Sequence, residues 1–160
     1  MIRIGNGFDV HAFASERRLI LGGVHIPHPY GLIGHSDADV LTHAICDALL
    51  GALALGDIGQ FFPDDDPAYK DADSLDLLRQ VYRHLEKKSA TVINIDSTLA
   101  LQTPKLASFI DEMRHNIASN LNCQIAQIGI KATTTERLGF VGRKEGVAAF
   151  AVALLELPDL

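Results

Sequence analysis

Apolar and polar residues alternate in the first part of the chain, as is typical of an extended strand. The pattern predicts a strand over residues 3–13. Because successive side chains of a strand point to opposite faces, Asp9 and His11 share one face. Phe8 and Val10 lie on the other face. The sequence therefore presents a carboxylate and an imidazole on the same side of one strand.

The next strong pattern is an almost continuous apolar helix. Ser36 and Asp39 fit a capping box, which predicts a helix over residues 37–54. The segment is apolar on most sides, and this is typical of a central, buried element. His43 and Asp47 interrupt the apolar pattern one turn apart, so two polar groups lie on a helix that is otherwise suited to the core.

The remaining segments alternate between strands and helices. Strands are predicted at 19–21 and 24–26, which form a hairpin, and at 91–101, 128–130 and 147–157; helices are predicted around Leu75, Leu78, Tyr82 and Leu85, and from Thr103 (N-cap) and Pro104 (first residue) to Leu121. The polar loop between the first two helices, residues 56–73, is longer than usual, which favours a functional role. This order predicts an α/β or α+β fold with a single sheet packed against helices.

Composition narrows the class of protein. With 48% apolar and 21% charged residues, the 160-residue chain is typical of one globular domain, here residues 1–160. No apolar run reaches the roughly 18 residues of a membrane span, and no leader pattern is seen at the start, so we expect a cytoplasmic protein without a membrane partner. The net charge of −6 disfavours a nucleic-acid partner. Cys46 and Cys123, each predicted within a helix, are expected as reduced, buried thiols.

Asp9, His11 and His43 form the first candidate site. Two histidines and one carboxylate, with a fourth position left open, are a common arrangement for catalytic zinc. Asp39 and Asp47 lie four residues before and after His43, so either carboxylate could accept the second N–H of its ring. The alternative is that His11 is a partly buried strand residue and His43 is a core histidine whose ring nitrogens are hydrogen-bonded within the protein. Spacing alone does not decide between the two interpretations.

Two further segments are suited to phosphate. His35 and Ser36 precede a helix, whose N-terminal amides bind anions, although Ser36 also fits a simple N-cap. Thr133 to Thr135 offer hydroxyls after a strand, and Glu136 could hold a hard cation such as Mg²⁺; an ordinary strand end is the alternative. Residues 37–76 contain ten Asp and one Lys, so a site for an anionic substrate there would need metal ions. Together these residues indicate metal-assisted phosphate chemistry and do not identify a substrate.

Longer motifs suggest a family. The chain contains GNGFDVHAF, LGGVHIP, HSDADVLTHAICDALLGALALGDIGQFFPDDDP, LQTPK and IKATTTERLGFVGRKEG. Over essentially its whole length it resembles the 2-C-methyl-D-erythritol 2,4-cyclodiphosphate synthase family of the non-mevalonate isoprenoid pathway. The resemblance implies a lyase that converts 4-diphosphocytidyl-2-C-methyl-D-erythritol 2-phosphate to the cyclic diphosphate and CMP. It also implies a homotrimer with its sheets around the three-fold axis and active sites between subunits. The absence of a transit segment favours a bacterial form.

The resemblance also implies roles for individual residues. Asp9, His11 and His43 correspond to the ligands of Zn²⁺ or another divalent transition metal. Glu136 corresponds to the ligand of Mg²⁺ or Mn²⁺, held together with the substrate diphosphate. His35 and Thr134 correspond to the catalytic residues that hold the reacting phosphates. Substrate contacts are implied for Asp9, His11, His35, Ser36, Asp57, Ile58, Gly59, Phe62, Pro63, Asp64, Asp65 and Asp66, and, on the nucleotide and diphosphate side, for Leu101, Gln102, Thr103, Pro104, Lys105, Leu106, Ala107, Thr133, Thr134, Thr135, Glu136, Phe140 and Arg143.

Two alternatives remain. A zinc hydrolase would share the same three ligands but would need a general base beside the open metal position, and it would release a linear diphosphate. A non-enzymatic trimeric module would bind isoprenoid diphosphates or metals without turnover. The final strand, residues 147–157, is apolar on both faces, and a monomer of this size would leave one of those faces uncovered.

Overall fold

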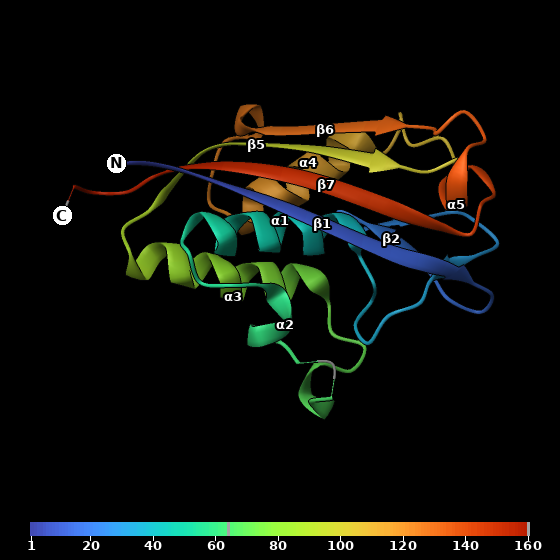
Figure 1. Ribbon diagram of the computed structural model, residues 1–160, viewed down its shortest axis with the longest axis horizontal. Helices are drawn as coiled ribbons and strands as arrows, with labels where there is room; N and C mark the ends of the chain where they lie inside the picture. Colours follow the sequence, from blue (N-terminus) through green and yellow to red (C-terminus); the bar gives the residue numbers. More distant parts are fainter. Residues whose placement is uncertain (64, 160) are drawn as a thin grey trace.

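The computed structural model describes residues 1–63 and 65–159, which form an α+β fold around a mixed five-stranded sheet of order β4-β1-β7-β5-β6 (Figure 1). The strands are β1 (Ile2–Ala14), β2 (Leu19–Leu21), β3 (Val24–Ile26), β4 (Gly31–Leu32), β5 (Thr91–Ala100), β6 (Ile128–Thr133) and β7 (Gly146–Glu156). β5 and β6 are parallel, whereas β1 and β5 both pair with β7 in antiparallel register. The hairpin of β2 and β3 is a separate two-stranded sheet, so the predicted single sheet is accompanied by a second, smaller one.

The helices are α1 (Val40–Ala52), α2 (Ile58–Phe61), α3 (Ser74–Lys87), α4 (Ile110–Asn120) and α5 (Gly139–Gly142), with 3₁₀ turns η1 (Pro67–Tyr69) and η2 (Ile125–Gln127). α1, α3 and α4 cover one face of the large sheet, whereas α5 packs at one end of the other face, where Val141 is buried with Ala100 and Ala148. α1 packs on β1 and β7, α4 packs on β6, and α3 packs against α1 and α4. Figure 1 shows α1 directly beneath the sheet and α3 in the next layer. Within the described residues, no helix has the length and apolar character needed to cross a bilayer.

Two glycines set the distance between α1 and β1. A Cβ atom on Gly7 would lie 1.9 Å from the carbonyl oxygen of Ala44, and one on Gly5 would lie 2.0 Å from that of Ala48. Any larger residue would therefore push the helix away from the strand. Gly5 and Gly7 share the strand face of Asp9, so this close contact also decides how near α1 comes to the candidate metal ligands.

The start of α1 differs from the prediction. The helix begins at Val40 rather than near residue 37, and Asp39 is its N-cap, with a side chain that accepts a hydrogen bond from the amide of Thr42. Ala38 has a φ of 58°, which is incompatible with a continuing helix. The capping box opened by Ser36 is therefore wrong, and Ser36 is left in the preceding loop.

The third long helix also begins later than predicted. α4 begins at Ile110. Asp111 and Glu112 place negative charge in its first turn, which stabilises the N-terminus of a helix. Thr103 and Pro104 belong to an irregular segment before the helix, so their interpretation as N-cap and first residue is wrong.

Two smaller expectations also needed correction. Cys123 lies beyond the end of α4 and is half-buried, whereas Cys46 is buried inside α1 as predicted; both are free thiols. The loop over residues 56–73 is not uniformly irregular, because it contains α2 and η1. The hairpin, α3, β5, β6 and β7 are confirmed to within a few residues of the predicted bounds.

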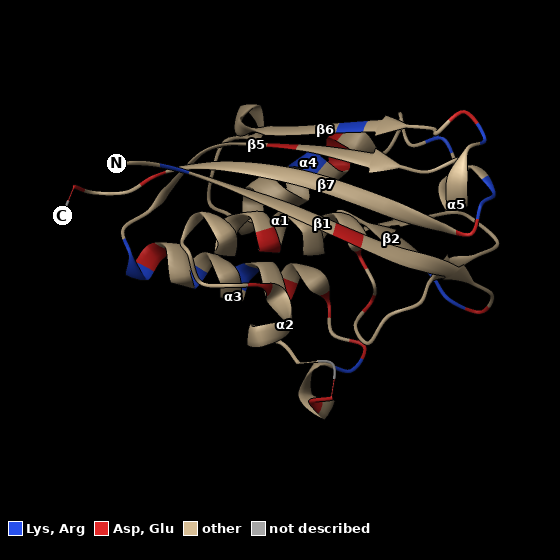
Figure 2. Cartoon of the chain, viewed as in Figure 1, with Lys and Arg blue, Asp and Glu red and all other residues tan. Residues whose placement is uncertain are grey.

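The sheet face opposite the helices is apolar and open. Ile4, Phe8 and Val10 on β1 and Phe150 and Val152 on β7 are each more than 40% exposed. The rings of Phe8 and Phe150 pair across the strands, with centroids 4.8 Å apart. Along most of its length β7 carries no charged residue (Figure 2). The other face of β7 is buried against α1, so both of its predicted apolar faces exist and only one is covered within the chain.

Candidate metal centre

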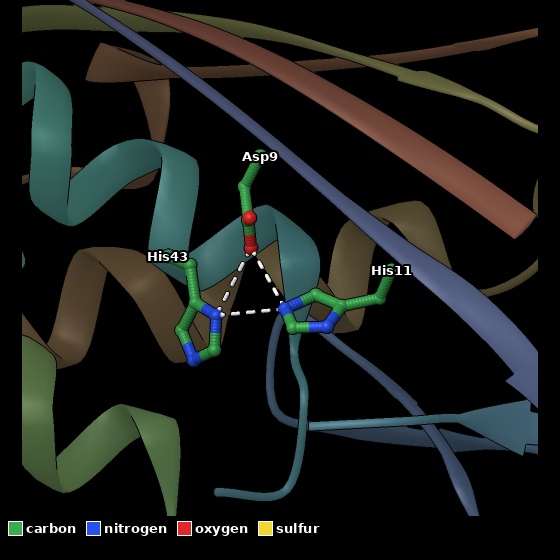
Figure 3. Close-up of side chains that lie close together, drawn as sticks. All are labelled: Asp9, His11 and His43. Carbon is green, nitrogen blue, oxygen red and sulfur yellow. Dashed lines mark hydrogen bonds and ion pairs between the residues drawn. The ribbon is translucent and has the colours of Figure 1, made fainter. Parts of the chain in front are cut away.

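Asp9, His11 and His43 converge on one point below β1 (Figure 3). Asp9 Oδ2 lies 3.0 Å from His11 Nε2 and 3.0 Å from His43 Nδ1. The two ring nitrogens are 3.3 Å apart. Strand alternation brings the first two side chains to the same face, and the close contact of α1 with β1 supplies the third.

The spacing of these atoms is suited to a small transition-metal ion. Zinc binds imidazole nitrogen and carboxylate oxygen at about 2.0–2.2 Å, and the edge of a tetrahedron with such bonds is about 3.3–3.6 Å. The three separations of 3.0, 3.0 and 3.3 Å are close to that edge. Two imidazoles and one carboxylate also form a donor set that zinc accepts. The residues present therefore fit a bound divalent transition metal.

The outer atoms of the ligands are held by the protein. His11 Nδ1 donates to the carbonyl oxygen of Ile33 at 2.5 Å, which orients the ring so that Nε2 faces the cluster. Asp9 Oδ1 accepts from the amide of Val10 at 2.9 Å. Burial alone would raise the pKa of the Asp9 carboxyl, but its hydrogen bonds and electrostatic attraction to His11 and His43 outweigh the effect of burial and hold that pKa well below its usual range. The carboxylate is thus ionised and available as a ligand.

The partners of His43 differ from the prediction. Its Nε2 lies 3.1 Å from Ser36 Oγ and 2.9 Å from Ser74 Oγ, not beside Asp39 or Asp47. Asp39 is instead buried against the β2–β3 turn and the first turn of α1, where two amides of the turn donate to it. Asp47 accepts from the amide of Ile58 and so anchors α2. Burial raises the pKa of both carboxyls.

A cavity of about 200 Å³ lies beside the three ligands. Five other predicted site residues line it: His35, Ser36, Ile58, Gly59 and Phe62. It is also lined by three residues that the sequence analysis missed, Gly34, Tyr69 and Leu77. Leu77 was not part of the predicted helical stripe, and Tyr69 lay in a segment interpreted as a polar loop, so neither carried a local signal of a site.

The neighbouring loop supplies backbone groups as well as side chains. His35 Nε2 donates to the carbonyl oxygen of Asp66 at 3.0 Å, which fixes the ring relative to η1. Asp57 and Asp66 act as side-chain caps of α2 and η1. Pro63 and Asp65 lie between these two turns, and Asp64 lies outside the described residues.

Arg17 supports the loop that carries His35 and Ser36. Its guanidinium donates to the carbonyl oxygens of Leu32, Gly34 and Ser36 at 3.1, 3.4 and 2.8 Å. One guanidinium group therefore binds the carbonyl oxygen of every second residue in this part of the loop. Arg17 carries no local sequence signal of this role, because its partners are main-chain atoms 15 to 19 residues away.

A second cavity, of about 360 Å³, lies at the far edge of the sheet. Eight of its lining residues belong to the predicted nucleotide and diphosphate side: Leu101, Gln102, Pro104, Lys105, Leu106, Ala107, Thr133 and Thr134. Ile110 and Ala132 complete the lining. Gln102 Oε1 accepts from the amide of Arg137 at 3.2 Å and so ties the two segments together.

The remaining predicted residues lie around the exposed end of β6. Thr134 Oγ1 is 3.4 Å from Glu136 Oε1, and both side chains are open to solvent. Thr135 Oγ1 donates to the carbonyl oxygen of Leu138 and shapes the turn into α5. Phe140 is exposed on α5, and Arg143 forms a two-point ion pair with Glu145 at 2.9 and 3.0 Å.

The two cavities do not meet within one chain. Asp9 and His11 are on β1, whereas Thr133 ends β6, and β7 and β5 lie between these strands (Figure 1). Three strand spacings correspond to about 14 Å. The structure thus gathers the predicted residues into two groups and does not bring Thr134 or Glu136 to the metal ligands.

A family profile covers almost the whole chain. The YgbB family profile matches residues 2–156. The chain belongs to the YgbB family. It is 59% identical to the 2-C-methyl-D-erythritol 2,4-cyclodiphosphate synthase of Chlorobaculum tepidum, over 97% of this chain and 99% of that protein. The synthase of Haemophilus influenzae strain KW20 is 57% identical over 97% of this chain and 98% of its own length. The resemblance inferred from the motifs is confirmed.

Solved structures agree with this assignment. The bifunctional IspDF from Campylobacter jejuni has a TM-score of 0.95 at 48% identity, and the match covers 99% of this chain and 43% of that longer chain. The Plasmodium falciparum IspF, described as a CDP complex, has a TM-score of 0.86 at 35% identity and is covered over 97% of its length. The family's fold therefore extends over essentially all of the chain.

Proposed function

We propose that this YgbB-family chain is a 2-C-methyl-D-erythritol 2,4-cyclodiphosphate synthase, with residues 1–160 as one catalytic domain. The observation that carries the proposal is the convergence of Asp9, His11 and His43 beside a cavity, in a chain so similar to curated synthases. The reaction converts 4-diphosphocytidyl-2-C-methyl-D-erythritol 2-phosphate to the 2,4-cyclodiphosphate and CMP.

The chemistry is an intramolecular phosphoryl transfer. An oxygen of the 2-phosphate forms a bond to the β-phosphorus, the bond from that phosphorus to the bridging oxygen breaks, and CMP leaves with this oxygen. Both reacting groups are anionic, so positioning and charge neutralisation supply most of the acceleration. The reaction needs no protein nucleophile.

The cavity beside Asp9 is the proposed site for the methylerythritol and its phosphates. Asp9, His11 and His43 would hold Zn²⁺ or another divalent transition metal, which when bound acts as a Lewis acid toward a phosphate oxygen. His35, fixed through Asp66, directs its other ring nitrogen to the reacting phosphates.

The second cavity is the proposed site for the cytidine diphosphate part. The segments 101–107 and 133–135 offer main-chain groups and hydroxyls to the nucleotide and its phosphates, and relatives are solved with CDP. Glu136 would hold Mg²⁺ or Mn²⁺, which offsets diphosphate charge when bound. Thr134 contributes its hydroxyl to the transferred phosphate.

A homotrimer would unite these two cavities. We infer that the metal group of one subunit faces the nucleotide group of the next, because each chain carries both groups at opposite edges of its sheet. The open apolar face of β1 and β7 supports this, since contiguous exposed apolar surface of this kind marks protein interfaces. The sheets would then surround the three-fold axis.

The assembly is tested by placing a charge on the open face. Phe150→Glu is expected to convert a particle of three times the 17.3 kDa chain mass into monomers, because an unpaired carboxylate cannot be buried there without a large penalty. Multi-angle light scattering measures the mass. His115→Glu, on the exposed side of α4, is the matched control and should leave the mass unchanged. A monomeric wild type would contradict the trimer and the shared sites.

The activity is tested directly with the proposed substrate. Incubation of the metal-loaded protein should release CMP and the cyclic diphosphate in equal amounts, identified by phosphorus NMR. A linear diphosphate product would favour the zinc hydrolase. Binding of isoprenoid diphosphates without turnover would favour the non-enzymatic module.

A further inference from the structure

His43 contacts two hydroxyls on the side of its ring that faces away from the metal cluster. Ser36 Oγ and Ser74 Oγ lie 3.1 and 2.9 Å from Nε2. The side chain of His43 is only 12% exposed, and Ser74 is fully buried at the first residue of α3. Ser74 is absent from the predicted site residues, and nothing in the metal chemistry described above uses it.

The proton of Ser74 is committed elsewhere. Its hydroxyl donates to Asp37 Oδ1. The same carboxylate accepts from the amide of Asp39 at 3.1 Å and from the amide of Ser74 itself at 3.0 Å. Asp37 is therefore surrounded by donors and acts as an acceptor only. A serine hydroxyl has one hydrogen, so Ser74 offers only oxygen lone pairs to His43.

This arrangement determines which nitrogen of His43 carries the proton. Facing a lone pair of Ser74, Nε2 must donate, and a neutral imidazole then has its free lone pair on Nδ1. Nδ1 is the atom that faces Asp9 and His11 in the cluster. Ser36 does not impose the same choice, because its oxygen accepts from the amide of Ala38 while its hydrogen remains free to turn toward Nε2.

We propose that Ser74 and Asp37 are positioning residues that fix His43 in the tautomer required for metal binding. The inference rests on the proposed metal site and adds two residues to it. Histidine ligands of metals are commonly oriented through the nitrogen that does not bind the ion. Here Ser74 accepts from that nitrogen of His43, and the carboxylate of Asp37 in turn holds the Ser74 hydroxyl.

The pair is built into a rigid junction. The amide of Asp37 donates to the carbonyl oxygen of Ala72 at 3.0 Å, and the amide of Asp71 donates to that of His35 at 2.8 Å. These bonds join the loop of His35 to the segment that begins α3. The position of Ser74 relative to His43 is thus set by main-chain bonds as well as by its own side chain.

Ser74→Ala tests the proposal through metal affinity. The substitution keeps the amide bond to Asp37 and removes only the hydroxyl. Competition with a chromogenic chelator should show zinc bound about 10–100-fold more weakly, the usual effect of losing such an orienting group. Ser97→Ala is the matched control, because Ser97 is also buried and donates to a main-chain carbonyl, that of Gly129, but lies on β5 away from the cluster. Its zinc affinity should equal that of the wild type.

A second readout follows the proton itself. Proton and nitrogen-15 NMR of the histidine rings in the zinc-loaded protein, at one fixed pH, should show the Nε2 proton of His43 in slow exchange with solvent in the wild type. In Ser74→Ala this proton should exchange faster, because it has lost its acceptor. Ser74→Thr retains the hydroxyl and should restore both the slow exchange and the zinc affinity, which a loss of packing alone would not explain.

The outcomes separate this inference from the proposed function. Wild-type zinc affinity and a wild-type exchange rate of the His43 Nε2 proton in Ser74→Ala would overturn the inference and leave the synthase proposal standing. Failure of the wild type to bind zinc would overturn both. Asp37→Asn provides an independent variant if Ser74→Ala does not fold. In it an amide replaces one acceptor oxygen, so it should weaken zinc binding in the same direction, and unchanged affinity would also count against the proposal.

Discussion

His43→Ala is expected to remove most of the bound zinc and most of the CMP release while the protein remains folded. The variant loses one of three ligand atoms from the cluster with Asp9 and His11. A metal acting as a Lewis acid contributes several kcal/mol to the transition state. At about 1.36 kcal/mol per factor of ten, the expected loss of turnover is on the order of 10³-fold. Zinc content by plasma mass spectrometry and CMP release by chromatography are the measurements.

A control separates the loss of a ligand from the loss of a histidine. His25→Ala removes an exposed imidazole from β3 and should change neither zinc content nor rate. Circular dichroism of both variants checks the fold. Zinc retained by His43→Ala at the wild-type ratio would show that His43 is not a ligand, whatever happened to the rate.

Glu136→Gln is expected to slow turnover while zinc content stays normal. The substitution keeps the size and polarity of the side chain and removes the charge that would balance a divalent cation on the diphosphate. Loss of one electrostatic contact of this kind costs roughly 10²–10³ in rate. Because Glu136 lies at the β6 end of the sheet, the zinc ligands on β1 and α1 should be unaffected. CMP release as a function of Mg²⁺ concentration is the measurement, and an unchanged rate and Mg²⁺ dependence would exclude Glu136 as the second-metal ligand.

Mixing the two inactive variants tests whether each active site is shared between subunits. In a trimer of His43→Ala and Glu136→Gln chains, some sites combine the intact metal group of one chain with the intact Glu136 of another. Random assembly of equal amounts gives about one such site in four, because each half is intact with a probability of about one half. About a quarter of wild-type activity should therefore return after the chains are unfolded and reassembled together. No recovery in verified mixed trimers would place both groups within one subunit.

Local patterns of apolar and polar residues predicted most of the strands and helices correctly. Alternation in residues 3–13 placed Asp9 and His11 together, because a strand repeats every two residues whatever surrounds it. The apolar composition of α1 likewise predicted its burial, and an isolated His43 within it indicated a polar partner in the core. Helix boundaries were less accurate. Ser36 and Thr103 carry ordinary capping signals, yet nearby backbone and side-chain contacts place the actual helix starts at Val40 and Ile110.

The sequence by itself determined the family, the identity of the chemistry-bearing residues and the strand face on which the first ligands lie, since these depend on residue type and short-range geometry. Only the tertiary structure decided which groups meet. Gly7 allows α1 close enough to β1 for His43 to reach Asp9, and Ser74, 31 residues along the chain, replaces the expected carboxylates at its Nε2. The strand order likewise separates Glu136 from the metal ligands. Such contacts join residues far apart in the chain, and their distances are set by packing and strand pairing rather than by local periodicity.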